Sequence, residues 1–399
     1  MSDWRWAVLI AMTATPLTGL AEDDATPKIV KLRLENLPSI SGRDDSDWTQ
    51  ARTALVPGER PLLLTTTSLT GKTGTHAYHD IHQTLSRDGG KTWSTPEVIP
   101  SLKRFQTDDG YEVAPGDLWP TWHARSGKVL VTGKTFNFER GAKENRLRER
   151  VSYAVMDPKS GAWGPLRLLE LPPNDHSGAP IVAANAGCNQ PFPLPNGQIL
   201  LPIRYRRGKK AGNYTTAVAR CAFDGETLRY LEHGSEHTIE RQRGLYEPSV
   251  IGFGGEFFLT MRADHSAYVS RSDDGLNYTP IKEWTFDDGE VLGSYNTQQH
   301  WVSAGGGLFL VYTRRGADND HVFRHRAPLF IAQVDPQRLQ VLRATERILL
   351  PENGATLGNS GVCRVSDRES LVTCGEGRVS LGPRRGENNR ILYVRITVN

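Results

Sequence analysis

The chain of 399 residues lacks a large excess of either charge, with 48 basic and 45 acidic residues. This balance gives no overall electrostatic basis for binding nucleic acid or an anionic membrane surface. Beyond the N-terminal stretch, no segment approaches the ~20 consecutive apolar residues that a membrane span needs. Long amphipathic helical patterns are missing as well, which argues against a helical fold.

Cysteine is scarce, and none of the four cysteines forms a Cys-x-x-Cys motif or a His/Cys spacing typical of zinc. The sequence therefore predicts no metal site of that kind. Cys188 and Cys221 flank one expected pair of strands, and Cys363 and Cys374 lie in successive strands of one expected hairpin. Two local disulfides in an oxidising compartment and four buried thiols are both consistent with this spacing.

The N-terminal stretch has the features of an export signal. Arg5 precedes an apolar run over residues 6–12, and small residues occur near position 21, before an acidic segment. We therefore expect residues 1–21 to be a signal peptide and the mature protein to be secreted or periplasmic.

Turn-forming and strand-forming residues are what the sequence has in abundance. Its 39 glycines and 24 prolines separate short runs rich in valine, isoleucine, threonine and aromatic residues. After Lys28 a unit of four strands recurs, and six copies are visible. They begin near Ala54, Leu118, Asn189, Glu247, Asn296 and Asn359.

Repeated four-stranded antiparallel units predict an all-β fold, a β-propeller, because radial closure protects the edges of the sheets. We expect residues 28–399 to form a single propeller domain. The visible copies indicate six blades, whereas a length of roughly 50 residues per blade suggests seven. Residues 28–34 are expected to close the ring by pairing with residues 391–397.

One turn stands out for its sequence, Ser-x-Asp-x-Gly-x-x-Trp, formed by Ser86, Asp88, Gly90 and Trp93. The Ser86 and Asp88 side chains can bond backbone N–H groups inside the turn, and Gly90 allows positive φ. Trp93 can fold back as an apolar plug. A degenerate version occupies residues 272–278, at the equivalent place in the fourth copy.

This turn is the Asp-box, or BNR motif, and nearly all of the mature chain resembles the sialidase superfamily of propellers. That group also includes bacterial glycoside hydrolases and polysaccharide lyases that act on rhamnose–uronate linkages and on ulvan. Asp-boxes lie on the face away from the active centre and also occur in non-enzymes, so the motif implies the fold rather than a function.

The resemblance extends to residues with a chemical role. Sialidases place a glutamate at the start of an inner strand and an arginine at the end of the next. Here Glu247, after Tyr246, is followed fifteen positions later by Arg262. The resemblance implies a glycosidase of sialidase-like type.

Three departures from the family's pattern are visible. Arg52 is one position out of step with the arginine expected near the start of the propeller. Residues 357–362 read Leu-Gly-Asn-Ser-Gly-Val where a sialidase has its nucleophilic tyrosine. The region of the acid/base aspartate reads His-Asp-Ile-His over residues 79–82.

Arginines are expected to gather on one rim of the propeller, where first strands begin and second strands end. Arginines from different blades would form a carboxylate clamp, because guanidinium groups bind carboxylates bidentately. This predicts an acidic sugar, either sialic or uronic acid, within an oligo- or polysaccharide substrate. The expected substrate-binding residues are Arg204, Arg262, Arg314, Arg324, His300 and Gln190.

Candidate catalytic groups lie on the same expected rim. His79 and His82 could transfer protons, since imidazole titrates near neutral pH, and Asp80 could act as an acid or orient a histidine. Tyr246, activated by Glu247, could replace the missing nucleophile. We expect hydrolysis of a glycosidic bond.

Two alternatives remain open beside hydrolysis. One is a polysaccharide lyase that cleaves a uronate linkage by His- or Tyr-assisted β-elimination. The other is a glycan-binding propeller without activity. No cofactor is required by any of these readings, although the Asn/Gln-lined inner strands could hold a calcium ion in the central channel.

Overall fold

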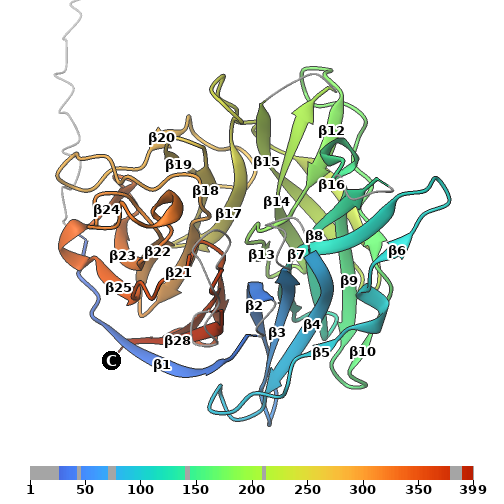
Figure 1. Cartoon of the computed structure of the whole chain (residues 1–399). Coiled ribbons are helices and arrows are strands. Elements are labelled where there is room, and N and C mark those ends of the chain that lie inside the picture. Colours follow the sequence, from blue (N-terminus) through green and yellow to red (C-terminus); the bar gives the residue numbers. More distant parts are fainter. Residues whose placement is uncertain are drawn as a thin grey trace, which may run out of the picture.

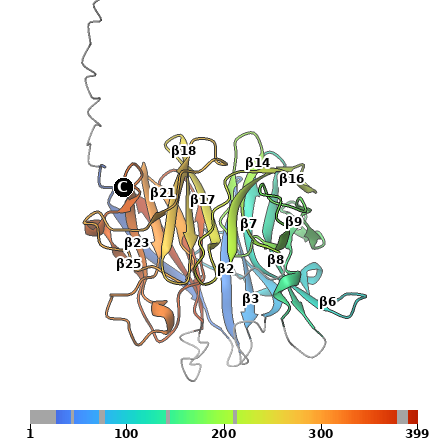
Figure 2. The same cartoon turned by 90° about the horizontal axis from the view of Figure 1, so that it is seen from above.

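The computed structural model describes residues 27–42, 46–70, 78–139, 144–208, 213–377 and 389–398, without the side chains of Tyr78 and His79. The expected signal peptide lies outside these residues. The described strands form six antiparallel sheets. Figure 1 shows the sheets arranged in a ring, with β2, β7 and β17 near its centre and β24 near its edge. Figure 2 shows the same blades from above.

The first three blades follow one another along the chain. Blade one comprises β2 (Asp47–Val56), β3 (Leu62–Thr70), β4 (Tyr78–Ser86) and β5 (Glu97–Val98). Blade two comprises β6 (Phe105–Gln106), β7 (Glu112–His123), β8 (Lys128–Phe138), β9 (Val151–Asp157), β10 (Ala162–Trp163) and β11 (Arg167–Leu168). Blade three comprises β12 (Ile181–Asn185), β13 (Phe192–Pro193), β14 (Gln198–Arg207), β15 (Tyr214–Phe223) and β16 (Leu228–His233).

The last three blades complete the ring. Blade four comprises β17 (Tyr246–Phe253), β18 (Glu256–Arg262), β19 (Ala267–Ser272) and β20 (Lys282–Glu283). Blade five comprises β21 (His300–Ala304), β22 (Gly307–Tyr312), β23 (Leu329–Asp335), β24 (Gln340–Val341) and β25 (Arg347–Leu350). Blade six comprises β26 (Ser360–Arg364), β27 (Glu369–Gly375), β28 (Ile391–Val398) and β1 (Leu32–Ile40). Short 3-10 turns are η1 (Pro100–Leu102), η2 (Arg146–Arg148), η3 (Phe323–His325) and η4 (Arg343–Thr345).

The propeller has six blades, so the number of visible sequence copies is confirmed and the estimate of seven is wrong. Blade two alone extends from Phe105 to Leu168, which is longer than the roughly 50 residues assumed for each blade. The ring closes through the expected pairing with the last strand, since β1 pairs antiparallel with β28 and Leu32 lies opposite Val398. The closing strand is Leu32–Ile40 rather than residues 28–34, so only residues 32–34 of the expected segment take part.

The hydrophobic core lies mainly between neighbouring blades. Trp284 of blade four and Trp301 of blade five are both fully buried, with ring centroids 5.7 Å apart. Their cluster also includes Phe258 and Tyr312, one from each of the two blades. Alternate side chains of each strand face opposite neighbours, so every sheet contributes to two such contacts.

The turn after β4 has the contacts expected from its sequence. The Gly90 N–H donates to Ser86 Oγ at 2.8 Å, and the Thr92 N–H donates to Asp88 Oδ1 at 2.9 Å. The Trp93 ring stacks on Tyr393 of β28, with centroids 4.0 Å apart and an interplanar angle of 14°. The turn therefore also joins blade one to blade six.

The four cysteines are free and buried, as in the thiol alternative. Burial raises the pKa of each thiol, so all four stay protonated near neutral pH. Within the described part of the chain, no helix has the length and apolar character of a membrane span.

Candidate functional site

The inner strands of four blades carry a register shift at a residue in the left-handed region. These residues are Gln50 of β2, Asp117 of β7, Ala183 of β12 and Glu247 of β17, with φ between 49° and 57°. Such bulges re-aim a side chain that regular alternation would place elsewhere. Non-glycine residues are uncommon in this region, and they concentrate where function imposes strain.

Five arginines converge beside the bulge at Glu247, and we call them the arginine cluster. Its members are Arg204, Arg243, Arg262, Arg324 and Arg326. Arg262 Nη1 donates to Glu247 Oε2, and Arg204 Nη1 lies 3.8 Å from Glu247 Oε1. The predicted proximity of Glu247 and Arg262 is therefore present, and Arg204 joins them from the neighbouring blade.

Asn296, just before β21, is a second centre of the cluster. Its side-chain oxygen accepts from Arg262 Nη2 at 2.6 Å, from Arg243 Nη2 at 3.0 Å and from Arg324 Nη1 at 3.5 Å. Its backbone carbonyl accepts from Arg326 Nη2 at 2.6 Å. Asn296 thus accepts hydrogen bonds from four guanidinium groups, three at its side chain and one at its backbone. Because Asn296 is neutral, it cancels none of their charge.

Tyr246 contacts a carboxylate other than the one expected. Its hydroxyl donates to Asp264 Oδ1 at 2.5 Å and accepts from Arg243 Nη2 at 2.6 Å. The group placed to activate Tyr246 is therefore Asp264 rather than Glu247. Burial raises the pKa of Tyr246 although the charges of Arg262 and Arg243 oppose this, so the phenol stays protonated at neutral pH.

The two carboxylates of the cluster are ionised. Burial acts to raise the pKa of Glu247, but the charges of Arg262 and Arg204 outweigh it and hold the pKa at about 2. Burial also acts on Asp264, whose pKa is held at about 2 by hydrogen bonds from Arg243 and Tyr246. Neither group can donate a proton near neutral pH.

Positive charge is in excess at the cluster, where five guanidinium groups face these two carboxylates. Burial and the nearby charges of Arg262 and Arg324 lower the pKa of Arg326 to about 9. Burial and the charges of Arg262 and Arg243 also lower the pKa of Arg324. Charged guanidinium groups that outnumber the carboxylates beside them form a site suited to an anion.

A buried polar network supports the cluster from blades two and three. Arg204 Nε donates to Asn185 Oδ1 at 3.0 Å, and the amide of Asn185 donates to Glu149. Glu149 in turn pairs with Lys134 at 3.2 Å, and Lys134 lies 3.6 Å from Asp117. These contacts fix the orientation of Arg204 before any ligand arrives.

A Tyr–His–Asp chain lies next to the cluster. The Tyr295 hydroxyl and His325 Nδ1 are 2.6 Å apart, and His325 Nε2 is 3.1 Å from Asp320 Oδ1. Arg324 and His325 both have left-handed φ, so the η3 backbone directs Arg324 towards Asn296 and His325 towards Tyr295. The arrangement matches a proton-transfer pair oriented by a carboxylate.

Several predicted residues lie outside the cluster. Arg314 donates from Nε to Glu346 Oε1 at 2.8 Å and from Nη2 to Glu346 Oε2 at 2.7 Å. The contacts described for His82 are with the Asp80 carbonyl, 2.9 Å from Nδ1, and with the edge of Trp48, 5.2 Å between centroids. β4 is the third strand from the axis, and neither of these contacts involves a residue of the arginine cluster.

Asp80 and His79 are the other two predicted acid–base residues of this region. Asp80 Oδ1 accepts from the Arg104 N–H at 3.1 Å. The side chain of His79 lies outside the described residues. The catalytic roles of His82, Asp80 and His79 remain predictions.

His300 and Gln190 lie deeper in the channel and bond to protein groups. His300 Nδ1 is 2.9 Å from Ser249 Oγ, and His300 Nε2 is 3.2 Å from Gln298 Oε1. Gln190 bonds both the N–H and the carbonyl of Trp301, which joins blade three to blade five. These contacts support a role in positioning the inner strands, and ligand binding by either residue remains a prediction.

Possible metal ligands occur in two places within the described residues. In the channel, the amides of Gln50 and Gln298 donate to Asn359 Oδ1 at 3.2 and 3.4 Å, so these side chains bond to one another, and a calcium ion there stays a prediction. On blade three, ligand atoms of His176, His233 and Glu236 lie within 4.8 Å of one another. The two imidazole rings are stacked in parallel at 4.2 Å, so their lone pairs do not converge on one point.

Sequence reasoning missed Arg243, Asp264 and Tyr295. Asp264 and Tyr295 adjoin residues that were expected on the rim, namely Arg262 and Asn296. Arg243 precedes the strand that holds Tyr246 and Glu247. Charged or aromatic residues that flank an expected rim position are the signal that could have identified them.

No protein-family model matches the sequence, and no curated protein is significantly similar to it. Solved structures with similar folds do exist. A protein of unknown function from Dyadobacter fermentans DSM 18053 has a TM-score of 0.64 and 16% identity, over 92% of this chain and 99% of its own. Trypanosoma rangeli sialidase, in complex with 2,3-difluoro-KDN, has a TM-score of 0.62 and 15% identity over 91% of this chain.

The phage phi92 endosialidase has a TM-score of 0.56 and 12% identity, over 92% of this chain and 69% of its own. This chain covers 58% of the length of the Trypanosoma rangeli sialidase. At such identities the similarity concerns the fold alone. The expected resemblance is confirmed at that level: the chain has a six-bladed β-propeller fold similar to that of solved sialidases.

Proposed function

We propose that the protein binds a glycan through the carboxylate of a sialic or uronic acid at the arginine cluster and cleaves the glycosidic bond of that sugar. The observation that carries the proposal is the convergence of five guanidinium groups around Glu247 and Asn296, with only Glu247 and Asp264 to balance their charge. This excess of positive charge, with burial, also lowers the pKa of Arg326 to about 9. A bound carboxylate would supply the missing negative charge and accept bidentate hydrogen bonds from guanidinium groups.

The solved structures with similar folds support the same class of ligand. Trypanosoma rangeli sialidase has been solved in complex with sialic acid, and its fold covers 91% of this chain. Export, which residues 1–21 indicate, would bring the protein into contact with extracellular glycans.

Hydrolysis is the first candidate reaction. It requires a group that protonates the leaving oxygen and a group that stabilises the positive charge at the anomeric carbon or attacks it. Glu247 and Asp264 are ionised and suit the second role. The hydrogen-bonded pair Tyr295 and His325 suits the first, since either ring can carry the proton.

β-Elimination is the second candidate, and the Tyr295–His325 pair is the observation that favours it. The arginine cluster would neutralise a uronate carboxylate and acidify the proton on C5. The pair would remove this proton, the C4–O bond would break, and the leaving oxygen would take up a proton. The products would be a C4=C5 unsaturated uronate and a new hydroxyl end.

The test is digestion of a panel of sialylated and uronate-containing glycans. Released sugar or new reducing ends, without the ultraviolet absorbance of an unsaturated uronate, would establish hydrolysis. A rise in that absorbance would establish elimination. Binding without any cleavage would identify a glycan-binding propeller.

Two variants make the test specific for the cluster. Arg326→Gln removes one guanidinium group from the cluster, and we expect it to abolish cleavage and binding. The matched control Arg229→Gln changes an exposed arginine that pairs with Asp224 on the outer strand of blade three, and it should behave as wild type. Equal activity in both variants would contradict the proposed role of the cluster.

A further inference from the structure

We propose that a second anion-binding subsite adjoins the arginine cluster, and that the substrate carries acidic groups on neighbouring sugars. This inference rests on the proposed function. The subsite is a cavity of about 520 Å³ between blades four and five, which we call the side pocket. Its lining includes Arg241, His265, Glu283, Leu292, Arg314 and Arg315.

Residues that line the side pocket lie next in the chain to residues of the arginine cluster. His265, which lines the pocket, directly follows Asp264, which bonds Tyr246 in the cluster. Arg241 of the pocket comes two residues before Arg243 of the cluster. Successive Cα atoms are only ~3.8 Å apart, so the two sites are immediate neighbours.

Tyr295 lies at the boundary between the two sites. The guanidinium group of Arg315, which lines the pocket, is 4.1 Å from the centre of the Tyr295 ring. The next residue, Asn296, accepts hydrogen bonds within the cluster. A glycosidic bond between a sugar in the cluster and a sugar in the side pocket would therefore pass the Tyr295–His325 pair, where the proposed chemistry needs a proton.

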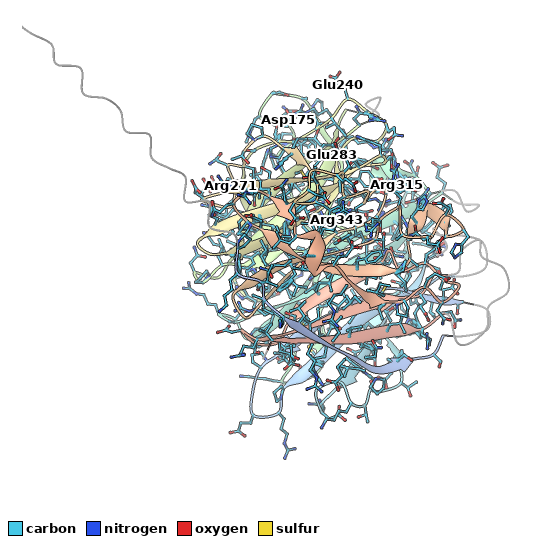
Figure 3. The ribbon with its side chains drawn as sticks, turned by 90° about the vertical axis from the view of Figure 1, so that its left-hand side faces the viewer. Asp175, Glu240, Arg271, Glu283, Arg315 and Arg343 are labelled. Atoms are coloured by element: carbon cyan, nitrogen blue, oxygen red, sulfur yellow. The ribbon has the colours of Figure 1, made fainter. Side chains whose placement is uncertain are left out.

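Two basic residues of the pocket have donors left for a ligand. Among the described residues, the Arg241 side chain has no hydrogen bond or ion pair. Arg315 donates from Nη2 to the His265 carbonyl at 3.0 Å, and within the described part of the chain its other guanidinium nitrogens make no hydrogen bond. Figure 3 shows Arg315 and Glu283 on one side of the molecule.

The other two arginines of the pocket form ion pairs with the protein, whereas one histidine nitrogen has no hydrogen-bond partner in the described structure. Arg314 is paired with Glu346, and Arg343 with Asp288 and Glu290. His265 Nδ1 is buried without a partner in the described structure. A buried polar atom without a partner costs free energy that a ligand could recover.

The chemistry points to the carboxylate of a second uronic or sialic acid. Arg241 and Arg315 both line the pocket, and guanidinium groups bind carboxylates bidentately, while Glu283 would exclude a ligand of much higher negative charge by repulsion. The volume lies within the range of pockets that hold small organic ligands, so the pocket can accept a sugar ring. The substrate class is thus an acidic oligosaccharide rather than a single capping sugar.

The test compares ligands of one and several acidic units by calorimetry. The probes are galacturonic acid and its trimer, and N-acetylneuraminic acid and its dimer. We expect wild type to bind the longer member of one pair roughly tenfold or more tightly than the monomer. The double variant Arg241→Gln/Arg315→Gln should bind the monomer as wild type does and lose the preference for the longer ligand.

The outcomes separate the subsite from the proposed function. A double variant that keeps the preference for the longer ligand overturns the subsite, and so does a wild type that binds both lengths equally well. If wild type binds none of the four probes, the proposed function and the subsite both fail. Arg229→Gln is the control for a general loss of positive charge, and thermal melts of all variants establish that they are folded.

Discussion

Replacing Arg326 by methionine should make the ligand-free protein more stable while removing its ability to bind an acidic sugar. Burial and the charges of Arg262 and Arg324 hold the pKa of Arg326 at about 9, against an ordinary value of 12.5. A cation that is harder to maintain in the folded state than in the unfolded chain opposes folding. Methionine has a similar length and no charge, so it removes this cost.

The size of the effect follows from the structure. The full difference between the two pKa values corresponds to about 5 kcal/mol. The substitution also removes the hydrogen bond to the Asn296 carbonyl, which costs about 1–3 kcal/mol. Because Arg326 is partly exposed, water screens some of the repulsion. We expect a net stabilisation of about 1–3 kcal/mol.

Thermal melts of wild type and Arg326→Met at several pH values measure this effect. For a protein of this size the melting temperature should rise by about 2–6 °C at neutral pH. The folded-state pKa of Arg326 lies below the unfolded-state value, so its cost is fully present below pH 9 and is relieved as the pH rises through about 9. The difference between the two proteins should therefore shrink above that pH.

Two further measurements complete this test. Glucuronate should raise the melting temperature of wild type but not of Arg326→Met, because only wild type has the complete binding site. Arg229→Met, which changes an exposed ion pair with Asp224, should leave the melting temperature nearly unchanged. A variant at position 326 that melts below wild type at neutral pH would refute the reasoning about excess charge.

Three other predictions concern the blades and the cluster. Trp93→Ala removes the ring stacked on Tyr393 and should lower the free energy of unfolding by about 2–4 kcal/mol in urea titrations; an unchanged midpoint would contradict its role as a plug. Glu247→Gln leaves Arg262 without its carboxylate and should lower the free energy of unfolding by about 3 kcal/mol at neutral pH. Because the pKa of Glu247 is about 2, below its ordinary 4.5, this advantage of wild type should disappear as the pH falls from 4.5 through about 2, and melts in which it persists at pH 2 would argue against the ion pair. Removal of residues 27–41 leaves β28 as an open edge and should produce a lower melting temperature and self-association by light scattering; a monomer that melts like wild type would show that β1 is not needed for closure.

The fold could be predicted because its signals are local. The bonds made by Ser86 and Asp88 depend on residues within one turn, and the strand-forming runs recur along the chain. Ring closure followed from the need to cover the edge of the last blade. The number of blades could not be obtained from length, since the loops of blade two make it longer than the others, and only counting the copies gave six.

The site could be predicted only in part, because it depends on the backbone outside regular strands. Glu247 and Arg262 were expected together, and they are in contact. Their neighbours Asp264 and Tyr295 were not expected, since left-handed residues and loops decide which way their side chains point. The rule that side chains alternate along a strand holds only where pairing is regular, and the inner strands are interrupted by bulges at the critical positions.

The bulges of the inner strands have a consequence for how such a protein can change over evolutionary time. At Gln50, Asp117 and Glu247, one extra residue lies beside the axis while strand pairing continues on either side of it. A mutation at one of these positions alters what the axis presents while the backbone pairing on either side of the bulge is kept. Specificity can therefore diverge one blade at a time, although a change at Glu247, which pairs with Arg204 and Arg262, also costs stability.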